Sequence, residues 1–342
     1  MSTLTLRNAA FSARVPRRLL VVNAVLSAVL FAVLATGLLG GTFPIGMQDL
    51  MAVFSGTADP VTQMVVVENR LPRLLTALGV GLAFGMAGEM LQTLLRNPLA
   101  SPDVIGFSAG AGLGAVMTVA LTGVSGLVLP GALAGGALTA TLLLALVWNK
   151  GMSPGAIVLV GIGLTVTLGV VTDLMIVRLD ANDVGELVKW IMGSLSARSW
   201  EDTVLVWAGL AVVAPLAAWH QFALARLTMA DEVAASLGQS LVQGRLITIV
   251  FAVVLVGFGV AAAGPLPFVA FVAGPIAHGL SRAPRPTLLT AAVVGALVTL
   301  LADRIAQALP GFFVLPAGIF TALIGAPVLI WVLIAQSRRR RR

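Results

Sequence analysis

The feature that most constrains this chain is the length of its uncharged apolar runs. Residues 104–149 contain no aspartate, glutamate, lysine or arginine over 46 positions, and residues 246–281 form a second such run. As a single helix, the first run would be about 69 Å long at a rise of 1.5 Å per residue. The hydrocarbon core of a bilayer is only about 30 Å thick. Each run must therefore fold back, and we place the turns at residues 122–126 and 264–267.

Composition supports a lipid environment. Hydrophobic residues make up 58% of the 342 positions and charged residues only 10%, whereas soluble domains average about 25% charged residues. The apolar runs are continuous and do not alternate, which favours helices over a barrel. We predict an all-α integral membrane protein with ten transmembrane helices. The predicted spans are 19–40, 74–95, 104–122, 127–148, 156–177, 204–219, 246–263, 266–281, 287–302 and 315–334.

The distribution of basic residues predicts the orientation. With ten spans and both termini in the cytoplasm, 15 of the 21 lysines and arginines lie inside and six lie outside. This bias follows the positive-inside rule. We therefore divide the chain into a basic cytoplasmic segment 1–18, a single ten-helix domain 19–335 and a basic cytoplasmic tail 336–342.

Several classes of function are excluded. The chain has no cysteine and only two histidines, which are far apart in sequence, so we predict no metal site, no cofactor and no catalytic constellation. No Walker A sequence is present, so the chain does not bind ATP through a P-loop. The net charge of +7 lies at the termini and in short loops, which fits membrane topology better than nucleic-acid binding.

Two connecting segments are not simply lipid-facing. Residues 221–240 fall in the cytoplasm and predict a pair of short amphipathic helices, one opened by Asp231 and Glu232 and closed by Gly238. Such a pair either docks onto a partner or lies on the lipid surface. The outer segment 178–202 contains a short apolar patch at 188–193. This patch forms either a re-entrant or surface helix or an ordinary loop with an interfacial tryptophan.

Charged residues near the spans also have alternative interpretations. Arg70 and Arg73 flank a proline at the outer end of the second span, where they either meet carboxylates of an external partner or anchor in lipid headgroups. Glu89 and Asp173 lie within spans. Intramembrane carboxylates are costly and usually face a cavity or a partner. We favour an interfacial or hydrogen-bonding role for both over a proton relay.

A long motif identifies the family. Residues 70–81 read RLPRLLTALGVG, residues 88–92 read GEMLQ, and residues 96–111 read RNPLASPDVIGFSAGA. This pattern resembles the FecCD family, the permeases of ABC importers for iron siderophores, haem and vitamin B12. Further matches are LVGIG at 159–163, WIMGS at 190–194, AASLG at 234–238, AGPLPFVA at 263–270 and LPAGIFTALIGAP at 315–327. Glu89 stands where the family usually has a small residue.

The resemblance implies the type II ABC importer permease fold in the bacterial inner membrane. It implies a second permease subunit, identical or paralogous, a cytoplasmic ATPase dimer, and a periplasmic or lipid-anchored binding protein. Residues implied to meet the binding protein are Arg70, Arg73 and Arg304. Residues implied to couple to the ATPase are Asp231, Glu232, Ala234, Ser236, Leu237 and Gly238. Motif residues implied in pathway packing are Arg96, Asn97, Pro98, Gly106, Gly110, Gly264 and Pro265.

The implied substrate is a ferric siderophore. Residues 97–107 and 302–307 are similar to the enterobactin-type branch of the family, which implies a catecholate. Vitamin B12 and haem remain alternatives because their permeases share most of these motifs. A proton-coupled secondary transporter that uses Glu89 and Asp173 is the alternative from a different class.

Overall fold

The computed structural model is dominated by long helices. It describes residues 3–8, 11–41, 43–122, 127–179, 185, 187–188, 190–283, 286–309 and 315–340. The only strands among these residues are β1 (Thr3–Asn8) and β2 (Phe11–Pro16), which pair antiparallel as a hairpin before the first helix. The basic N-terminal segment therefore contains a hairpin, which we did not predict from the sequence.

The helices follow the predicted spans closely. Their bounds are α1 (Arg17–Leu39), α2 (Met47–Ser55), α3 (Pro60–Gln63), η1 (Met64–Arg70), α4 (Leu71–Leu94), α5 (Phe107–Thr122), α6 (Val128–Trp148), α7 (Pro154–Ile176), α9 (Trp200–Leu227), α10 (Asp231–Ser236), α11 (Leu241–Ala263), α12 (Val269–Ser281), α13 (Leu288–Ala308) and α14 (Ala317–Arg340). Within the described residues, seven helices are long and apolar enough to cross a membrane. Three shorter apolar helices lie within α5, α12 and α14.

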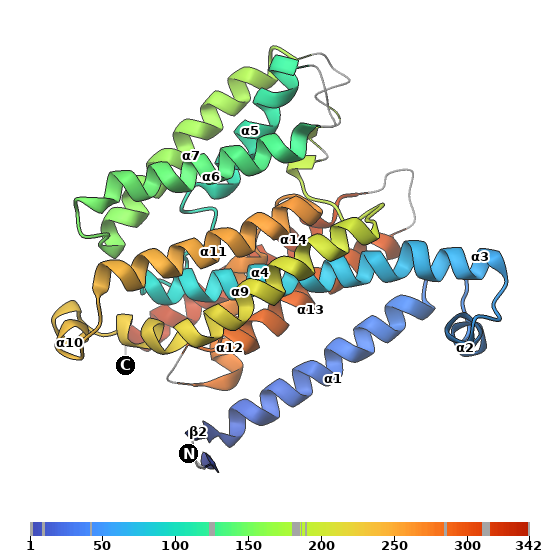
Figure 1. Ribbon diagram of the computed structural model, residues 1–342, viewed down its shortest axis with the longest axis horizontal. Coiled ribbons are helices and arrows are strands. Elements are labelled where there is room, and N and C mark those ends of the chain that lie inside the picture. Colours follow the sequence, from blue (N-terminus) through green and yellow to red (C-terminus); the bar gives the residue numbers. More distant parts are fainter. Residues whose placement is uncertain are drawn as a thin grey trace.

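The second span is longer than predicted because α3, η1 and α4 form one helical rod of 35 residues, Pro60–Leu94. The segment η1 is a π-helix that ends just before Pro72. Proline lacks an N–H group and crowds the carbonyl one turn earlier. A wider π turn relieves that crowding without ending the helix, so the rod continues beyond the bundle (Figure 1).

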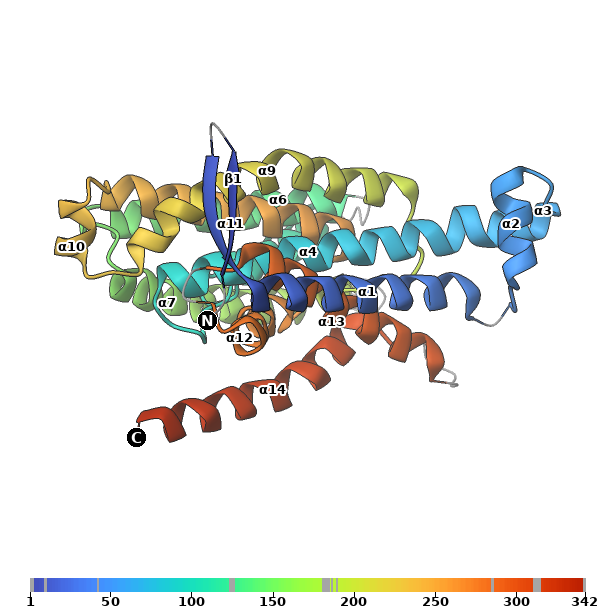
Figure 2. The same cartoon turned by 90° about the horizontal axis from the view of Figure 1, so that it is seen from below.

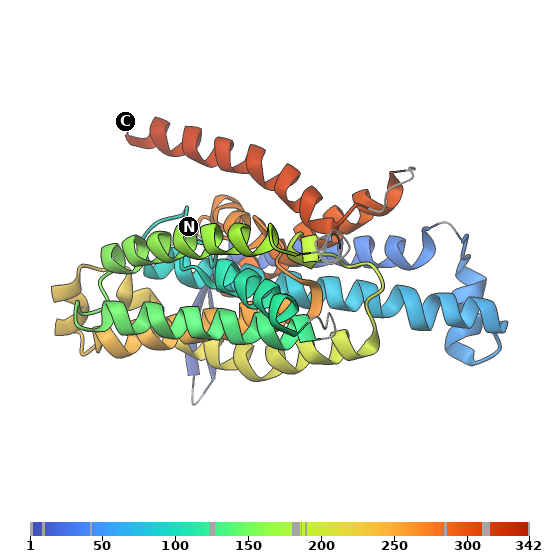
Figure 3. The same ribbon diagram turned by 90° about the horizontal axis from the view of Figure 1, so that it is seen from above.

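The rod occupies the centre of the bundle. Helices α9, α11, α12 and α13 pack around α4, while α5, α6 and α7 form a group that joins the rest along α11 (Figure 1). Seen from below, α1 runs along one side and α14 leaves the bundle at an angle (Figure 2). The view from above shows the same departure of α14 (Figure 3). The N-terminal hairpin and the end of α14 lie toward α10, opposite α2 and α3 (Figure 1).

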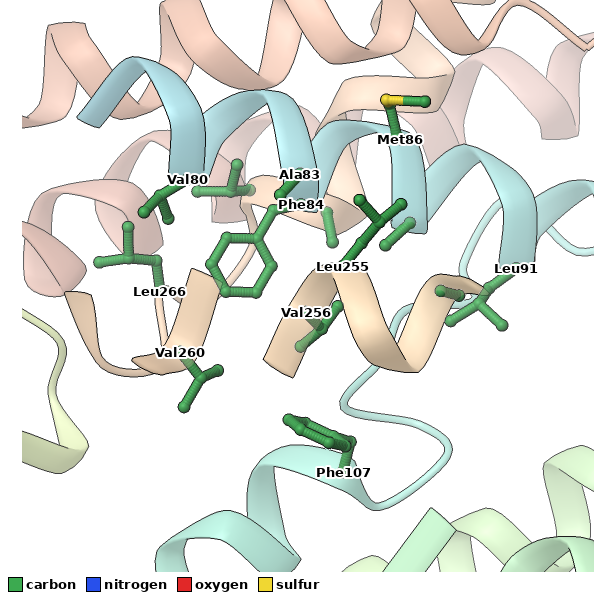
Figure 4. Close-up of a cluster of buried hydrophobic side chains, with 14 of the residues drawn as sticks. Val80, Ala83, Phe84, Met86, Leu91, Phe107, Leu255, Val256, Val260 and Leu266 are labelled. Atoms are coloured by element: carbon green, nitrogen blue, oxygen red, sulfur yellow. The ribbon is translucent and has the colours of Figure 1, made fainter. Parts of the chain in front are cut away.

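Apolar side chains of α4 and α11 meet in the core. Phe84 of α4 points toward α11, which carries Leu255 and Val260, while Val80 lies beside Leu266, and Phe107 at the start of α5 approaches α11 from the other side (Figure 4). All six side chains are less than a tenth exposed. This contact links the central rod to the α5–α7 group.

Small residues set the closest helix contacts, because glycines spaced as Gly-x-x-x-Gly, such as Gly81 and Gly85, let helix backbones approach closely. A Cβ added at Gly81 would lie 2.4 Å from Cα of Ala296 in α13, and one at Gly85 would lie 2.3 Å from the Ala291 oxygen. A Cβ at Gly110 of α5 would lie 2.7 Å from the Gly135 oxygen of α6. The helix backbones therefore touch where the glycines lie.

The two turns predicted within the apolar runs are present, but two helices extend further than predicted. Helix α5 ends at Thr122 and α6 begins at Val128, so the first uncharged run folds back there; residues 123–126 lie outside the described part of the chain. The second run breaks between α11 and α12, as predicted. Helix α9 continues to Leu227, so α10 alone is a separate helix where a pair was expected. Helix α14 continues to Arg340 and so includes the first residues of the predicted tail 336–342.

Gly81→Ala tests whether glycine contacts set the spacing of α4 and α13. Alanine favours a helix by about 1 kcal/mol over glycine, but overpacking costs about 1–3 kcal/mol. We expect a lower unfolding temperature for the purified chain in detergent. The control is Gly112→Ala in α5, where no described atom lies within 4 Å of the new Cβ. Equal stability of the two variants would contradict the close contact.

Candidate functional site

The short helix α10 stands at one end of the bundle, between the ends of α9 and α11 (Figure 1). Asp231 and Glu232 occupy its first turn, where carboxylates favour the positive end of a helix. Gly238 follows with φ of +76°, a left-handed conformation that glycine adopts without strain. The predicted start at Asp231 and stop before Gly238 are therefore confirmed.

Arg96 begins the Arg-Asn-Pro sequence that follows α4, and its side chain holds this region in place. Its backbone is left-handed, with φ of +50°. Its guanidinium donates to the Leu227 carbonyl at 3.1 and 3.0 Å, to the Met229 carbonyl, and to Oδ1 of Asp231 at 2.8 Å. The planar five-donor guanidinium suits such a multiple contact. Arg96 thus ties the central helix to the end of α9 and to the first residue of α10.

Arg245 completes the clamp from α11. Its Nη2 donates to Oδ2 of Asp231 at 2.6 Å, and its Nη1 donates to the Gly151 carbonyl between α6 and α7 at 3.1 Å. The Arg245 side chain is only 4% exposed. The hydrogen bonds from Arg245 and then from Arg96 hold the pKa of Asp231 below its ordinary value of 3.8, although partial burial acts the other way. One carboxylate therefore joins α4, α10 and α11.

The outer surface of α10 is unpartnered among the described residues. Met229, Val233 and Leu237 recur at a spacing of four and are 43%, 48% and 57% exposed, whereas Ala234 is fully buried. Glu232 and Ser236 are also exposed. The helix therefore presents an apolar stripe flanked by polar groups while its base is held by the Arg96–Asp231–Arg245 clamp.

At the opposite end, Arg73 is committed to the bundle. Its Nη2 lies 2.7 Å from Oδ1 of Asp303 and its Nε lies 3.0 Å from Oδ2, a bidentate pair between α4 and α13. Asp303 is 1% exposed and also accepts from Gln307 at 2.7 Å. Because α13 continues to Ala308, Asp303 lies inside a helix and not in the predicted loop. Arg73, 24% exposed, keeps only part of its surface open.

Arg70 and Arg304 surround the end of α1. Arg70 donates to the Leu38 and Phe43 carbonyls, which satisfies an unpaired carbonyl at the negative end of α1. A Cβ at Gly40 would lie 2.5 Å from Nη2 of Arg304, so Arg304 lies against the same turn. The three arginines expected at the outer face are thus gathered at one end, each half-buried.

The remaining motif residues shape loops and close contacts. Gly264 has φ of +74° and packs against the Trp190 carbonyl, and Gly193 packs on the Pro265 carbonyl. The apolar patch in the outer segment therefore lies against the α11–α12 connection. Asn97 accepts from the Leu99 amide at 3.0 Å in the turn that contains Pro98. Gly106, with φ of +83°, precedes α5.

The two intramembrane carboxylates differ in their surroundings. Glu89 is fully buried, and its Oε1 lies 2.8 Å from Nε2 of His278. Asp173 is exposed on α7, on the same face as Val166 and Val170. Within the described residues, no group of three or more histidines, cysteines or carboxylates could hold a metal ion.

Sequence reasoning missed the partners that complete each site. Arg245 looked like an ordinary cytoplasmic charge before an apolar run, and nothing in its spacing marked it as the partner of Asp231. Asp303 falls just after the predicted span 287–302, and only the similarity at 302–307 singled it out. The two pairs join residues 14 and 230 positions apart, and a single sequence does not show such tertiary contacts.

These features define a membrane-embedded helix bundle around one central helix, with a short helix clamped at one end. The sequence profile of the FecCD transport family matches residues 28–335, and the chain belongs to this family. The ferric enterobactin transport system permease protein FepG of Escherichia coli (strain K12) is 34% identical over 95% of this chain and 99% of its own length. The Fe(3+)-citrate import system permease protein YfmE of Bacillus subtilis (strain 168) is 35% identical over 81% of this chain and 84% of its own length.

The fold also resembles a solved structure. An inward-facing conformation of a metal-chelate type ABC transporter superposes with a TM-score of 0.82 at 25% identity, covering 92% of this chain and 99% of that one. The chain is therefore a multi-pass helical membrane protein of the permease class.

Asp231→Asn tests the clamp through its pH dependence. The folded pKa of Asp231 is lowered, so the ion pair stabilises the chain fully above the ordinary pKa of 3.8 and is lost as the pH falls below it. We expect the variant to be less stable by about 1 kcal/mol at pH 7, because Asp231 is 37% exposed and solvent screens the pair. Thermal unfolding of both proteins should give a difference that is constant above pH 5 and shrinks below pH 3.8.

The neighbouring exposed Glu232→Gln serves as the control and should leave stability unchanged. A difference between Asp231→Asn and the unchanged chain that persists at the acidic end would contradict an ionised Asp231 in the clamp.

Proposed function

We propose that this chain is the permease subunit of an ATP-driven importer that carries a ferric siderophore across the bacterial cytoplasmic membrane. The observation that carries the proposal is α10: its base is clamped to α4 and α11 through Asp231, while Met229, Val233 and Leu237 remain exposed. A helix that is rigidly held and apolar on its free side suits the transmission of a partner's motion. In this proposal the partner is a cytoplasmic ABC ATPase dimer.

We place α10 and both termini in the cytoplasm. Between its two termini the chain would then cross the membrane ten times. The N-terminal hairpin and the end of α14 lie toward α10 (Figure 1). The Arg338–Arg342 run and Arg17 and Arg18 belong to those ends, so this orientation agrees with the positive-inside rule.

The exposed face of α7 supports a second permease subunit. Ile162, Val166, Val170 and Leu174 are exposed along α7, and Asp173 is exposed among them. A carboxylate facing lipid within a span is costly and generally faces a partner or a water-filled path instead. We therefore propose that α7 faces a second, identical or paralogous subunit and lines half of a central pathway.

At the outer end we propose docking of a substrate-binding protein on Arg70 and Arg304, with Arg73 in a supporting position. Arg70 and Arg304 are close enough for their charges to repel, so an acidic group placed between them would relieve that repulsion. Arg73 already pairs with Asp303 and holds α4 against α13.

For the substrate we propose a catecholate siderophore. Support comes from the FepG relative, which matches nearly the whole chain and is named for ferric enterobactin. The YfmE relative is named for Fe(3+)-citrate, so citrate is the competitor that the experiment must separate. Vitamin B12 and haem are included as further test substrates.

Leu237→Glu tests the ATPase contact. A charge in the apolar stripe should prevent association with the ATPase, because burying an unpaired carboxylate in an interface is costly. We expect uptake and co-purification of the ATPase to be lost while the amount of inserted protein stays unchanged. Ser240→Glu, a charge on an exposed residue outside the stripe and outside the coupling residues, is the matched control and should reduce both far less. Normal uptake by Leu237→Glu would contradict α10 as the coupling element.

Substrate preference is tested by uptake of radiolabelled substrates in cells that lack the chain and in cells that regain it, with an iron label for the ferric complexes and haem and a cobalt label for vitamin B12. Restored uptake of a ferric catecholate, with little restoration for ferric citrate or a ferric hydroxamate, is the expected result. Uptake that persists after ATP depletion but stops with an uncoupler would contradict the ATP-driven proposal. Restoration of citrate, haem or vitamin B12 uptake alone would contradict the catecholate.

A further inference from the structure

A buried acid–base pair joins three helices near the α10 end of the bundle. Oε1 of Glu89, in α4, lies 2.8 Å from Nε2 of His278 in the last turn of α12. The same oxygen accepts the backbone N–H of Thr287 at 2.9 Å, immediately before α13. One carboxylate therefore holds the end of α12 and the positive N-terminus of α13 against the central helix.

The pair is not a fully satisfied structural network. Oε2 of Glu89 and Oγ1 of Thr287 are buried and have no hydrogen-bond partner within the described part of the chain. Buried polar atoms in proteins are almost always paired. A Cβ at Gly274 would lie 2.8 Å from Oε2 of Glu89 and 2.0 Å from Oε1 of Gln92, so the glycine makes room for both polar groups. The pair therefore keeps one buried carboxylate oxygen that no described donor reaches.

Solvent reaches the pair from one side only. The Glu89 side chain is 0% exposed, whereas His278 is 41% exposed. Histidine is the side chain that ordinarily changes charge between pH 5 and 8, and a coupled acid–base pair exchanges protons as a unit. His278 thus gives a buried carboxylate a route to protons from the solution at this end.

The charges on the surrounding helices are few. Arg18 of α1 donates to the Leu280 carbonyl at 2.8 Å, and Arg282 follows α12. From α4, the neutral Gln92 donates to the Phe271 carbonyl at 2.9 Å. On the described part of α13, the charged groups Asp303 and Arg304 lie at the other end of the helix. No described carboxylate other than Glu89 faces His278.

We propose that Glu89 and His278 bind one exchangeable proton that holds the end of α12 and the start of α13 against α4. With the proton bound, the imidazolium neutralises the buried carboxylate and both helix ends are held. When the proton leaves at higher pH, a neutral imidazole faces a buried carboxylate that has lost its counter-charge, which weakens the attachment. The end of α12 and the start of α13 then separate from α4 more often as the pH at this end rises. The inference concerns the chain itself and stands apart from the proposed substrate and partners.

Amide hydrogen exchange on the purified full-length chain in lipid nanodiscs tests the proposal between pH 6 and 8.5. Exchange in peptides that span residues 279–290 is divided by the intrinsic rate at each pH. We expect the protection factor to fall by about tenfold across this range, because the equilibrium constant for local opening should rise by the same factor. Peptides from the middle of α11 should show no such change.

His278→Gln is the deciding variant because glutamine can still donate a hydrogen bond to Glu89 but does not titrate. We expect its protection to be independent of pH. His220→Gln is the matched control: His220 is the other histidine, contacts Thr248 at 2.8 Å, and has no described carboxylate partner. It should keep the pH dependence of the unchanged chain.

A pH dependence that survives in His278→Gln, or that is absent from the unchanged chain, would overturn the proposal. Glu89→Gln provides a second measurement, since it keeps an acceptor for the Thr287 amide without the negative charge. It should also be independent of pH. None of these measurements depends on transport, so their failure and the failure of the proposed function are separate results.

Discussion

Lipid offers no hydrogen-bond partners, so each polar group within the bundle must find its partner inside the protein. Helix α4 contributes many of these partners because it runs through the centre with 18 of its 24 residues buried. Its glycines bring α13 into backbone contact, and its polar residues lie mainly toward its two ends. Arg73 binds Asp303 at one end; Glu89, Gln92 and Arg96 bind α12, α13 and the α10 region at the other. Helices α9, α11, α12 and α13 pack directly against this rod.

This arrangement gives a physical connection between the two ends of the molecule. Asp231 of α10 contacts Arg96 at the end of α4 and Arg245 in α11. Arg245 also binds the Gly151 carbonyl in the turn between α6 and α7, the helix that carries Asp173. Because packed helices shift as units and do not bend freely, we propose that motion at α10 is passed along these contacts to the exposed face of α7. The same rod reaches the outer arginines more than 30 Å away, taking about 1.5 Å per helical residue.

Much of the architecture could be predicted from hydropathy alone. The fold-back between Thr122 and Val128 follows from a run too long to span once, and the break after Ala263 follows from Gly264 and Pro265. The start of α10 at Asp231 follows from helix-terminus chemistry. In contrast, the continuation of α9 to Leu227 was not predicted, because polar residues such as His220 and Gln221 interrupt the apolar run and the residues after them were predicted as a separate short helix. The pairs Arg245–Asp231, Arg73–Asp303 and His278–Glu89 depend on tertiary contact across 14, 230 and 189 positions.

We propose that α10 is a cytoplasmic element held rigidly for docking by an ATPase. The chain contains no cysteine, so a single Leu237→Cys substitution can be labelled without background by a maleimide that does not cross membranes. If α10 lies in the cytoplasm, Leu237→Cys should be labelled in inside-out vesicles but not in intact spheroplasts, and bound ATPase should protect it from labelling. Labelling of Leu237→Cys in intact spheroplasts, with Met51→Cys in α2 protected there, would contradict it.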